Sequence, residues 1–373
     1  MTKLSKNSSN SSLRKDLNGK KFLVIQQKMI GDVLTSSMLC EAIKKEFPTA
    51  EVHYLVNQHT LPVLENNPFI DKKVVITTQI EKSVKRFYKF LLGIKNENYD
   101  VVIDVYGKIG STLISYYSGA KIKIAYHKKH TSVFYSHTIE RLATPENQAS
   151  LAIENRLSLL KPLGINFQNL EPKIYLSTSE KENAKQFLEE SGLNLSQPIV
   201  MISVLGSGPQ KTYPPNYMAK LLDYLVNHWQ EVQVLFNYIP KQREEALAIY
   251  SATTEKTQKH IYFEVFGKSL RQFLAITHFC KAVIGNEGGA NNMAKALGIP
   301  TFSIFAPYLN KQNWFGKIEE DKHLAKHLSE FISFTEEDLS KSKRNPEAYY
   351  QAFKPEFLKK DLHRFIEKIK DEV

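Results

Sequence analysis

The sequence predicts an α/β protein built from two doubly wound domains, each with a parallel sheet covered by helices on both faces. The chain has 373 residues, more than one domain usually holds. Short apolar runs alternate with amphipathic helical segments, and these runs lack the strict alternation of a half-exposed sheet. The same alternation begins again past Glu171 and Pro172, where we place the domain linker.

The first half repeats strand and helix in order. Its first helix ends before Pro48, because proline cannot continue a helix. The predicted strands are 22–26, 51–56, 73–77, 99–105 and 122–126, and the predicted helices are 33–47, 80–94, 109–118 and 151–160. We therefore expect an N-terminal Rossmann-like domain over 19–172. It is preceded by a polar tail, 1–18, whose serine-rich and asparagine-rich composition predicts disorder.

The second half follows the same order, and Pro215 stands where a proline is favoured, at a helix start. The predicted strands are 199–205, 232–236, 261–263, 282–284 and 301–305, and the predicted helices are 216–229, 241–250, 269–279 and 293–297. We expect a C-terminal Rossmann-like domain over 173–335. A helical tail, 336–373, should pack back on the body. Ligands of such sheets bind at the carboxyl ends of the strands, so the cleft between the two domains is the expected active site.

Composition and charge indicate where the protein acts and what kind of partner it binds. No apolar run reaches the roughly 18 residues that a membrane span needs, and the N-terminus lacks the apolar core of a secretory signal. Cys40 and Cys280 are the only cysteines, which favours a reducing, cytoplasmic location. The net charge of +11 favours acidic partners: nucleotide, nucleic acid, anionic lipid and phosphorylated glycan all fit.

Part of that charge lies on one segment, 82–91, which is a predicted basic helix with Val84, Phe87, Phe90 and Leu91 on its apolar side. Basic amphipathic helices can lie on anionic membranes. Two interpretations stay open: a peripheral contact with the inner face of the cytoplasmic membrane, or the solvated face of a globular helix.

A glycine-rich loop, 285–292, joins an apolar strand to a helix. Its glycines let a ligand approach the backbone, and the free N–H groups of the helix start attract an anion such as phosphate. An ordinary tight loop is the alternative.

Two further turns carry candidate residues. Asp32 opens the first helix of the first domain and could be a general base or merely a first-turn acid. Lys211 closes a small-residue turn in the second domain and could meet a phosphate or lie free on the surface. That turn is no Walker A loop, because Gln210 replaces its last glycine and Pro214 and Pro215 precede the helix.

Other chemistries lack support. His127 and His130 are closely spaced, but Lys128 and Lys129 between them would repel a cation, so we expect no metal site. No Gly-x-Ser-x-Gly elbow is present to anchor hydrolase chemistry.

These pieces together resemble glycosyltransferase family 9, the heptosyltransferases of lipopolysaccharide core assembly. The resemblance covers about residues 20 to 310. It is carried by the order of five segments: 22–25, 30–34, 67–71, the turn from Gly206 to Pro214, and 285–300.

The family implies a GT-B fold, with an acceptor-binding N-terminal domain and a nucleotide-sugar-binding C-terminal domain. It also implies an inverting, metal-independent transfer of a sugar, heptose from ADP-heptose, to a lipopolysaccharide core or related glycan. Asp32 would then deprotonate the acceptor hydroxyl, and Lys211 would stabilise the departing diphosphate. The implied donor-binding residues are Gly206, Ser207, Lys211, Thr212, Asn286, Glu287, Gly288, Gly289 and Asn292. No cofactor and no nucleic-acid partner are expected; the partners are the nucleotide sugar and a glycolipid or glycan acceptor.

Three positions depart from the family pattern, which usually has Asp at Glu287, Ser or Thr at Gly288 and His at Asn292. A carboxylate beside a diphosphate is repulsive, so we expect Glu287 to accept hydrogen bonds from hydroxyls of the donor sugar. Two alternatives follow: a non-catalytic nucleotide-sugar-binding relative, or an epimerase-like enzyme that needs no acceptor.

Overall fold

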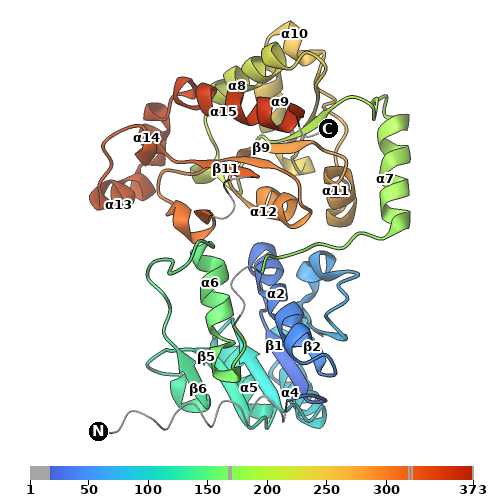
Figure 1. The fold of residues 1–373 in the computed structure, drawn as a ribbon, viewed down its shortest axis with the longest axis vertical. Helices are drawn as coiled ribbons and strands as arrows, with labels where there is room; N and C mark the ends of the chain where they lie inside the picture. Colours follow the sequence, from blue (N-terminus) through green and yellow to red (C-terminus); the bar gives the residue numbers. More distant parts are fainter. Residues whose placement is uncertain (1–16, 167–169, 318–319, 321, 372–373) are drawn as a thin grey trace. The chain divides into compact units, whose positions relative to one another are not determined.

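The computed structural model describes residues 17–166, 170–317, 320 and 322–371. The chain divides into two compact units (Figure 1). The first comprises 1–175 with 312–316, and the second 176–311 with 317–373. The predicted tail lies outside the described residues except for 17–18. Leu17 is part of a turn and its side chain is 3% exposed, so burial of an apolar group orders this end of the predicted tail.

The first unit contains one six-stranded parallel sheet. Its strands are β1 (Lys21–Ile25), β2 (Glu51–Asn57), β3 (Lys72–Ile76), β4 (Val101–Asp104), β5 (Ile122–Tyr126) and β6 (His137–Ile139). The strand order is β3-β2-β1-β4-β5-β6, with β1 hydrogen-bonded to β2 on one side and β4 on the other. The order therefore reverses between β1 and β4, where ligands of doubly wound sheets bind.

The helices of the first unit are α2 (Ile30–Glu46), α3 (Thr78–Glu81), α4 (Val84–Asn96), α5 (Ile109–Tyr117) and α6 (Leu151–Ser158). One prediction was wrong here: the single helix expected over 80–94 is two helices. Thr77 caps α3 by accepting the Ile80 N–H, and Ser83 caps α4 by accepting the Arg86 N–H. Two hydroxyl caps six residues apart start two helices in place of one.

The second unit contains a five-stranded parallel sheet of the same kind. Its strands are β7 (Ile199–Ser203), β8 (Gln233–Phe236), β9 (Ala282–Asn286), β10 (Thr301–Ile304) and β11 (His323–Lys326), in the order β11-β10-β9-β7-β8. The predicted strand 261–263 is only a single bridge, from Ile261 to Val234. Here the order reverses between β7 and β9.

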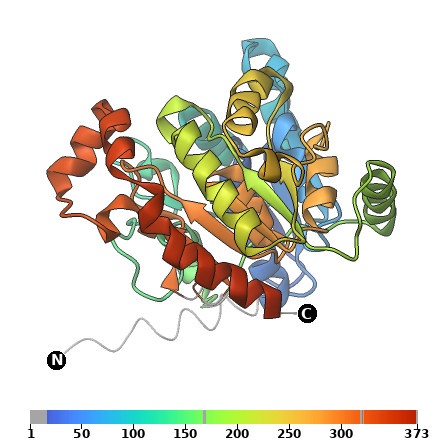
Figure 2. The same ribbon diagram turned by 90° about the horizontal axis from the view of Figure 1, so that it is seen from above.

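The helices of the second unit cover both faces of this sheet. They are α7 (Thr178–Glu190), α8 (Pro215–His228), α9 (Arg243–Ser251), α10 (Glu255–Gln258), α11 (Leu270–Thr277), α12 (Gly289–Ala296), α13 (Glu336–Arg344), α14 (Pro346–Ala352) and α15 (Pro355–Asp371). Figure 2 shows α15 running beside α8, where Leu358, Leu362 and Ile366 are fully buried in the core of the unit. Sequence reasoning missed α7 and β11. No described helix combines the length and the apolarity that a bilayer crossing needs.

Helix α7 is attached to α11 by one bidentate ion pair. The Arg271 guanidinium donates from Nε to Glu180 Oε1 and from Nη2 to Glu180 Oε2, both at 2.6 Å. Glu180 also completes the capping box of α7 by accepting from the Ser177 N–H. These donors, the guanidinium first, lower the pKa of Glu180 to about 2.

We predict that Glu180→Gln lowers the free energy of unfolding by about 2 kcal/mol at pH 7. The folded pKa lies below the ordinary value. The stabilisation is therefore present above about pH 4.5 and is lost as the pH falls toward 2. Urea unfolding of both proteins at pH 7 and pH 3 measures the difference. Glu189→Gln, an exposed change on the same helix, is the control. An equal difference at both pH values would contradict the prediction.

Candidate functional site

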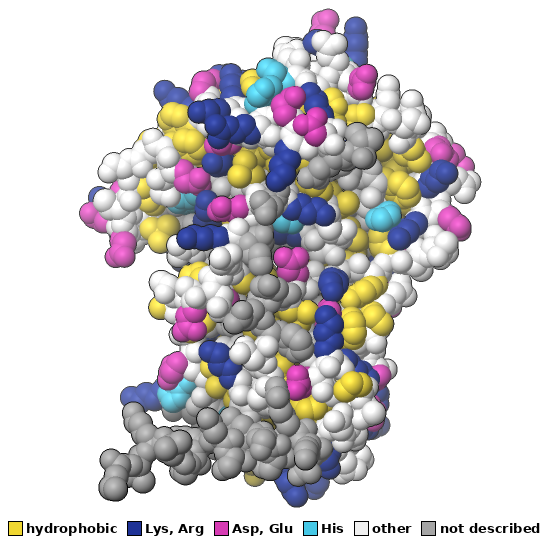
Figure 3. All heavy atoms as spheres, viewed as in Figure 1, with side chains coloured by type: hydrophobic (Ala, Val, Ile, Leu, Met, Phe, Trp, Pro, Cys, Tyr) yellow, Lys and Arg dark blue, Asp and Glu magenta, His cyan; other side chains and the backbone are white. Residues whose placement is uncertain are grey.

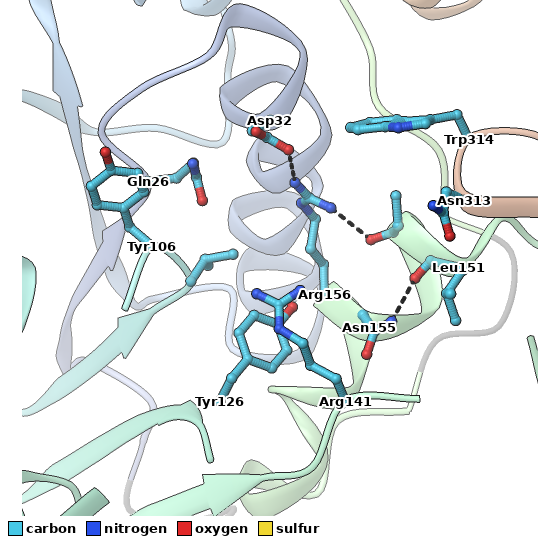
Figure 4. A pocket seen from close by; sticks show the side chains of 12 residues that line it. Gln26, Asp32, Tyr106, Tyr126, Arg141, Leu151, Asn155, Arg156, Asn313 and Trp314 are labelled. Carbon is cyan, nitrogen blue, oxygen red and sulfur yellow. Dashed lines mark hydrogen bonds and ion pairs between the residues drawn. The ribbon is translucent and has the colours of Figure 1, made fainter. Parts of the chain in front are cut away.

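The first unit contains a cavity of about 390 Å³ at the carboxyl ends of its strands. Its walls come from the segments after β1, β4 and β6, from the end of β5, from α2 and α6, and from the short segment 312–316 (Figure 4). The lining residues are Gln26, Asp32, Val105, Tyr106, Tyr126, Arg141, Leu151, Ala152, Asn155, Arg156, Asn313 and Trp314. The cavity therefore occupies the point where the strand order reverses, as expected for a ligand site.

Asp32 lies in the first turn of α2 and lines this cavity. The residue before the helix is Met29, and no side chain caps the helix there, so Asp32 is not a capping residue. Its Oδ1 accepts a hydrogen bond from Nη2 of Arg156 at 2.7 Å (Figure 4). The carboxyl group is one-third exposed, which leaves it accessible to a ligand in the cavity.

Arg156 projects from α6 and is held by three hydrogen bonds. Its Nε donates to Ser36 Oγ at 2.8 Å, its Nη1 to the Ala152 carbonyl at 2.8 Å, and its Nη2 to Asp32. The side chain is 9% exposed. A buried guanidinium needs a partner of opposite charge, and it fixes that partner's orientation in return. Arg156 thus holds the carboxylate of Asp32 at one position in the wall of the cavity.

Arg141 and Trp314 also line the cavity. The guanidinium of Arg141 lies 3.7 Å from the ring centre of Tyr126, a cation–π contact. Trp314 and Asn313 come from the segment 312–316, which sequence reasoning assigned to the second domain. Gly316 secures this segment, because a Cβ at that position would lie 2.5 Å from backbone atoms of 148–150. The cavity thus offers guanidinium groups and aromatic faces beside one carboxylate.

In the second unit, the two loops at the reversal point carry the predicted donor-binding residues. One loop follows β7 and contains Gly206, Ser207, Lys211 and Thr212; the other follows β9 and contains Glu287 and Gly288. Because β7 and β9 are neighbours, both loops leave the same edge of the sheet side by side. The sequence-predicted residues therefore group as expected: Asp32 in the first unit, and all the others together in the second.

Asn286 ties these two loops together. Its Oδ1 accepts from the Tyr213 N–H at 2.6 Å, and its Nδ2 donates to the carbonyls of Ser203 and Val204 at 2.9 Å. With its side chain 1% exposed and its donors used, we assign Asn286 a positioning role. Thr212 shapes the first loop in the same way, accepting from the Gly206 N–H and donating to the Gly208 carbonyl.

Two glycines are required at this edge of the sheet, one inside the loop after β7 and one in β9. A Cβ at Gly206 would collide with the backbone carbonyl of Lys211. Gly285 has φ +127°, and a Cβ there would lie 2.5 Å from the Ser203 carbonyl oxygen. A side chain at Gly206 would open the turn between Gly206 and Lys211, and a side chain at Gly285 would push β9 away from β7 just before the two loops begin.

Helix α12 begins directly after the second loop, at Gly289, four residues earlier than predicted. No side chain caps this start, so backbone N–H groups of its first turn point outward from the carboxyl edge of the sheet. Asn292 bonds back to the Gly288 carbonyl through its own N–H. A helix start without a cap is suited to an anion.

Glu287 is the most unusual group of this site. Its side chain is 8% exposed, and among the described residues its Oε2 is buried without a hydrogen-bond partner. Burial raises the pKa of Glu287, and the positive charges of Lys211 and Lys295 oppose the rise. Tyr308, which follows β10, lies close enough for the Glu287 charge to raise its pKa further. Sequence reasoning missed Tyr308, although its place after a predicted strand was a usable signal.

We predict that Glu287→Gln changes how stability depends on pH. The folded pKa of Glu287 is raised, so its contribution to stability is complete below pH 4.5 and falls as the pH rises through the folded value. The wild type should therefore lose thermal stability relative to the variant between pH 4.5 and pH 8. Unfolding temperatures measured across that range test this, with the exposed Glu245→Gln as control. A gap that stays constant with pH would refute it.

Comparisons with known proteins agree with this arrangement. The sequence profile of glycosyltransferase family 9 (heptosyltransferase) matches residues 87–345. Lipopolysaccharide heptosyltransferase 1 of Campylobacter coli is 24% identical over 342 residues, covering 86% of this chain and 97% of that protein.

Solved structures show the same fold. The family 9 glycosyltransferase of Veillonella parvula superposes with a TM-score of 0.79 at 17% identity, covering 96% of this chain and 99% of its own. The ADP-heptose lipopolysaccharide heptosyltransferase II of E. coli gives 0.65 at 18% identity, covering 87% and 98%. The profile match extends over more than half of the chain. The resemblance seen in the sequence is thereby confirmed: the chain belongs to glycosyltransferase family 9 and is a glycosyltransferase of the GT-B fold.

Proposed function

We propose that this enzyme transfers heptose from ADP-heptose to a lipopolysaccharide core or related glycan, with inversion and without a metal ion. The observation that carries the proposal is the carboxylate of Asp32, held by Arg156 in the wall of a cavity. The family membership supports heptose as the sugar. The E. coli relative, whose name specifies ADP-heptose and lipopolysaccharide, supports the donor and the acceptor.

In the proposed reaction, Asp32 takes the proton of an acceptor hydroxyl in the cavity of the first unit. The oxygen attacks the anomeric carbon of the donor sugar while the bond from that carbon to the diphosphate breaks. Its electron pair leaves with ADP. One displacement from the opposite face inverts the anomeric centre. A single carboxylate is enough, because no covalent sugar–enzyme intermediate forms.

In the second unit, Lys211 and the start of α12 would receive the charge that develops on the diphosphate. Backbone N–H groups and an ammonium that are already in place stabilise such charge without reorganisation. Gly206 lets the first loop close on the Lys211 backbone, and Gly285 lets β9 lie close to Ser203 of β7. Glu287, with its buried unpaired oxygen, would accept a hydroxyl of the donor sugar. Gly206, Ser207, Gly288 and Gly289 would lie along the diphosphate, and these donor contacts stay predictions.

The acceptor cavity supports an anionic glycan. Trp314 and Tyr106 offer flat apolar faces on which sugar rings can stack, and the Arg141 guanidinium is exposed at the cavity wall. An arginine recognises carboxylate or phosphate groups through two parallel hydrogen bonds. An acceptor glycan that carries carboxylate or phosphate groups fits this lining better than a neutral glycan does.

We predict that Asp32→Asn lowers kcat by about 10²-fold to 10⁴-fold, the usual contribution of a general base. The amide keeps a hydrogen-bond acceptor for Arg156 and so avoids the unpaired buried guanidinium that alanine would leave. The affinity for ADP-heptose should be unchanged, because the donor site is in the second unit. Initial rates and calorimetric donor titrations measure both quantities.

The matched control is Glu65→Gln, which removes the half-exposed ion pair of Lys73 and Glu65 in the same unit. This variant should turn over like the wild type. If the Asp32→Asn enzyme has a native near-ultraviolet spectrum and still turns over at the wild-type rate, Asp32 is not the general base.

We predict that Lys211→Ala weakens ADP binding by about 10-fold to 100-fold, the loss expected for a charge-assisted contact to phosphate. Lys220→Ala, an exposed lysine of α8, should leave the affinity unchanged. Calorimetric titration of both variants with ADP provides the comparison. The same titration with UDP and GDP tests the nucleotide, because tighter binding of either would overturn the assignment to ADP.

A further inference from the structure

Large apolar side chains are exposed mainly on one face of the first unit. Of the twelve exposed large hydrophobic residues among the described ones, eight belong to α4, α5 and the 3₁₀ turn Ser132–Phe134. We call this set the α4–α5 face; it consists of Val84, Tyr88, Leu92, Ile109, Leu113, Tyr116, Val133 and Phe134. Val84 is 90% exposed and Val133 83%. Such a concentration exceeds the scattered apolar residues of an ordinary surface.

The exposure follows from the sequence of α4, which has two apolar stripes. Leu91 and Ile94 face the core, with Phe87 and Phe90 packed against it. Val84, Tyr88 and Leu92 recur every four residues and therefore form a second stripe, which points outward. The sequence-based expectation that Val84 shares the inner stripe was wrong. Helix α5 repeats the arrangement, with Ile109, Leu113 and Tyr116 outward and Ile114 inward.

Aromatic rings join these stripes into one continuous surface. Tyr88 of α4 meets Tyr117 of α5 edge to face, at 6.3 Å between ring centres. Tyr117 meets Tyr116 at 5.9 Å, and Tyr116 meets Phe134 at 6.0 Å. The contacts run from one helix across the next to the 3₁₀ turn, so the three segments that carry the eight residues adjoin one another.

The same segments hold nearly all the net positive charge of the chain. Residues 82–96 and 105–139 contain ten lysines and arginines and no aspartate or glutamate, against a net charge of +11 for the whole chain. Lys82, Lys85, Lys89, Lys121 and Lys129 form no ion pair with any described residue. Figure 3 shows lysine and arginine side chains at the lower end of the view, which is part of the first unit.

We propose that the α4–α5 face binds the surface of a bilayer that contains anionic phospholipid. Valine, leucine and isoleucine side chains would enter the boundary between headgroups and acyl chains, and tyrosines favour that boundary because one end of the ring is polar. The lysines would lie at the phosphate level, with their apolar stems along the protein. This proposal rests on the proposed function in one respect, because it brings the cavity to an acceptor anchored in a membrane.

The positive charge of the α4–α5 face favours an anionic bilayer over a second copy of the chain as the partner. A second copy of the chain, related by a two-fold axis, would place ten positive charges opposite ten more, without one acidic residue of 82–96 or 105–139 to compensate. An anionic bilayer compensates all of them.

The test is sedimentation of the full-length protein with vesicles, in the absence of any substrate, so that failure here leaves the proposed transfer reaction unaffected. Phosphatidylglycerol-containing vesicles should bind the protein, and phosphatidylcholine vesicles should bind it at least about tenfold more weakly. Binding should weaken as the ionic strength rises from about 0.05 to 0.5 M, because salt screens the lysines.

Two triple variants separate the contributions. Lys82→Gln, Lys85→Gln and Lys89→Gln together should weaken binding by about 10-fold to 100-fold. Val84→Ser, Tyr88→Ser and Val133→Ser together should weaken it by about tenfold or more at unchanged charge. The control for charge is the triple change Lys185→Gln, Lys220→Gln and Lys268→Gln in the second unit, and the control for apolar exposure is Leu247→Ser. Both controls should bind like the wild type, and circular dichroism checks that every variant is folded.

Three results would overturn the proposal. The first is equal binding by the wild type and both α4–α5 variants. The second is an equal loss in the lysine variant and its charge-matched control, which would make net charge alone responsible. The third is a wild-type protein that ignores vesicles but self-associates with rising concentration, with the association abolished by the serine variant; this would identify a second copy as the occupant.

Discussion

Each sheet depends on the first strand of its unit being paired on both sides. β1 is hydrogen-bonded to β2 and β4, and β7 to β8 and β9, all in parallel. Parallel strands end at the same edge, so the segments after β1 and β4, and those after β7 and β9, must lie together there. Asp32, Tyr106, Lys211 and Glu287 owe their positions to this constraint before any side-chain contact forms. The backbone topology thus makes both sites, and the side chains refine them.

Buried polar groups do that refinement. Arg156 and Asn286 are both almost fully buried. Each forms several hydrogen bonds that join segments far apart in the sequence. A buried donor without a partner costs about 1–3 kcal/mol, more if charged, so alternative loop positions that break these bonds are disfavoured. Arg156 therefore fixes the position of the Asp32 carboxylate, and Asn286 fixes the position of the loop after β7.

Whether a feature could be predicted from the sequence depends on how far apart along the chain its interacting residues lie. Asp32 and the glycine loops were predictable, because strand, turn and helix are local patterns. Arg156 was not: it meets Asp32 across 124 positions of sequence and looks like any residue of an amphipathic helix. Trp314 was not either, since the segment 312–316 belongs to the first unit although its sequence neighbours belong to the second. The caps Thr77 and Ser83 were visible in the sequence, but hydrophobic periodicity outweighed them.

The unpaired oxygen of Glu287 connects the fold to the choice of donor. An acidic group beside a helix start and two lysines would be stable as an anion if water or hydroxyls reached both oxygens, yet Oε2 is buried without a partner. Gly285 and Asn286 fix the backbone around Glu287, so Oε2 stays without a hydrogen-bond donor in the folded protein. A sugar hydroxyl could donate a hydrogen bond to Oε2. A phosphate oxygen has no proton to donate, and its negative charge would repel the carboxylate. In the proposed reaction, Glu287 would therefore face the sugar end of the nucleotide sugar, and Lys211 and the start of α12 would face its diphosphate.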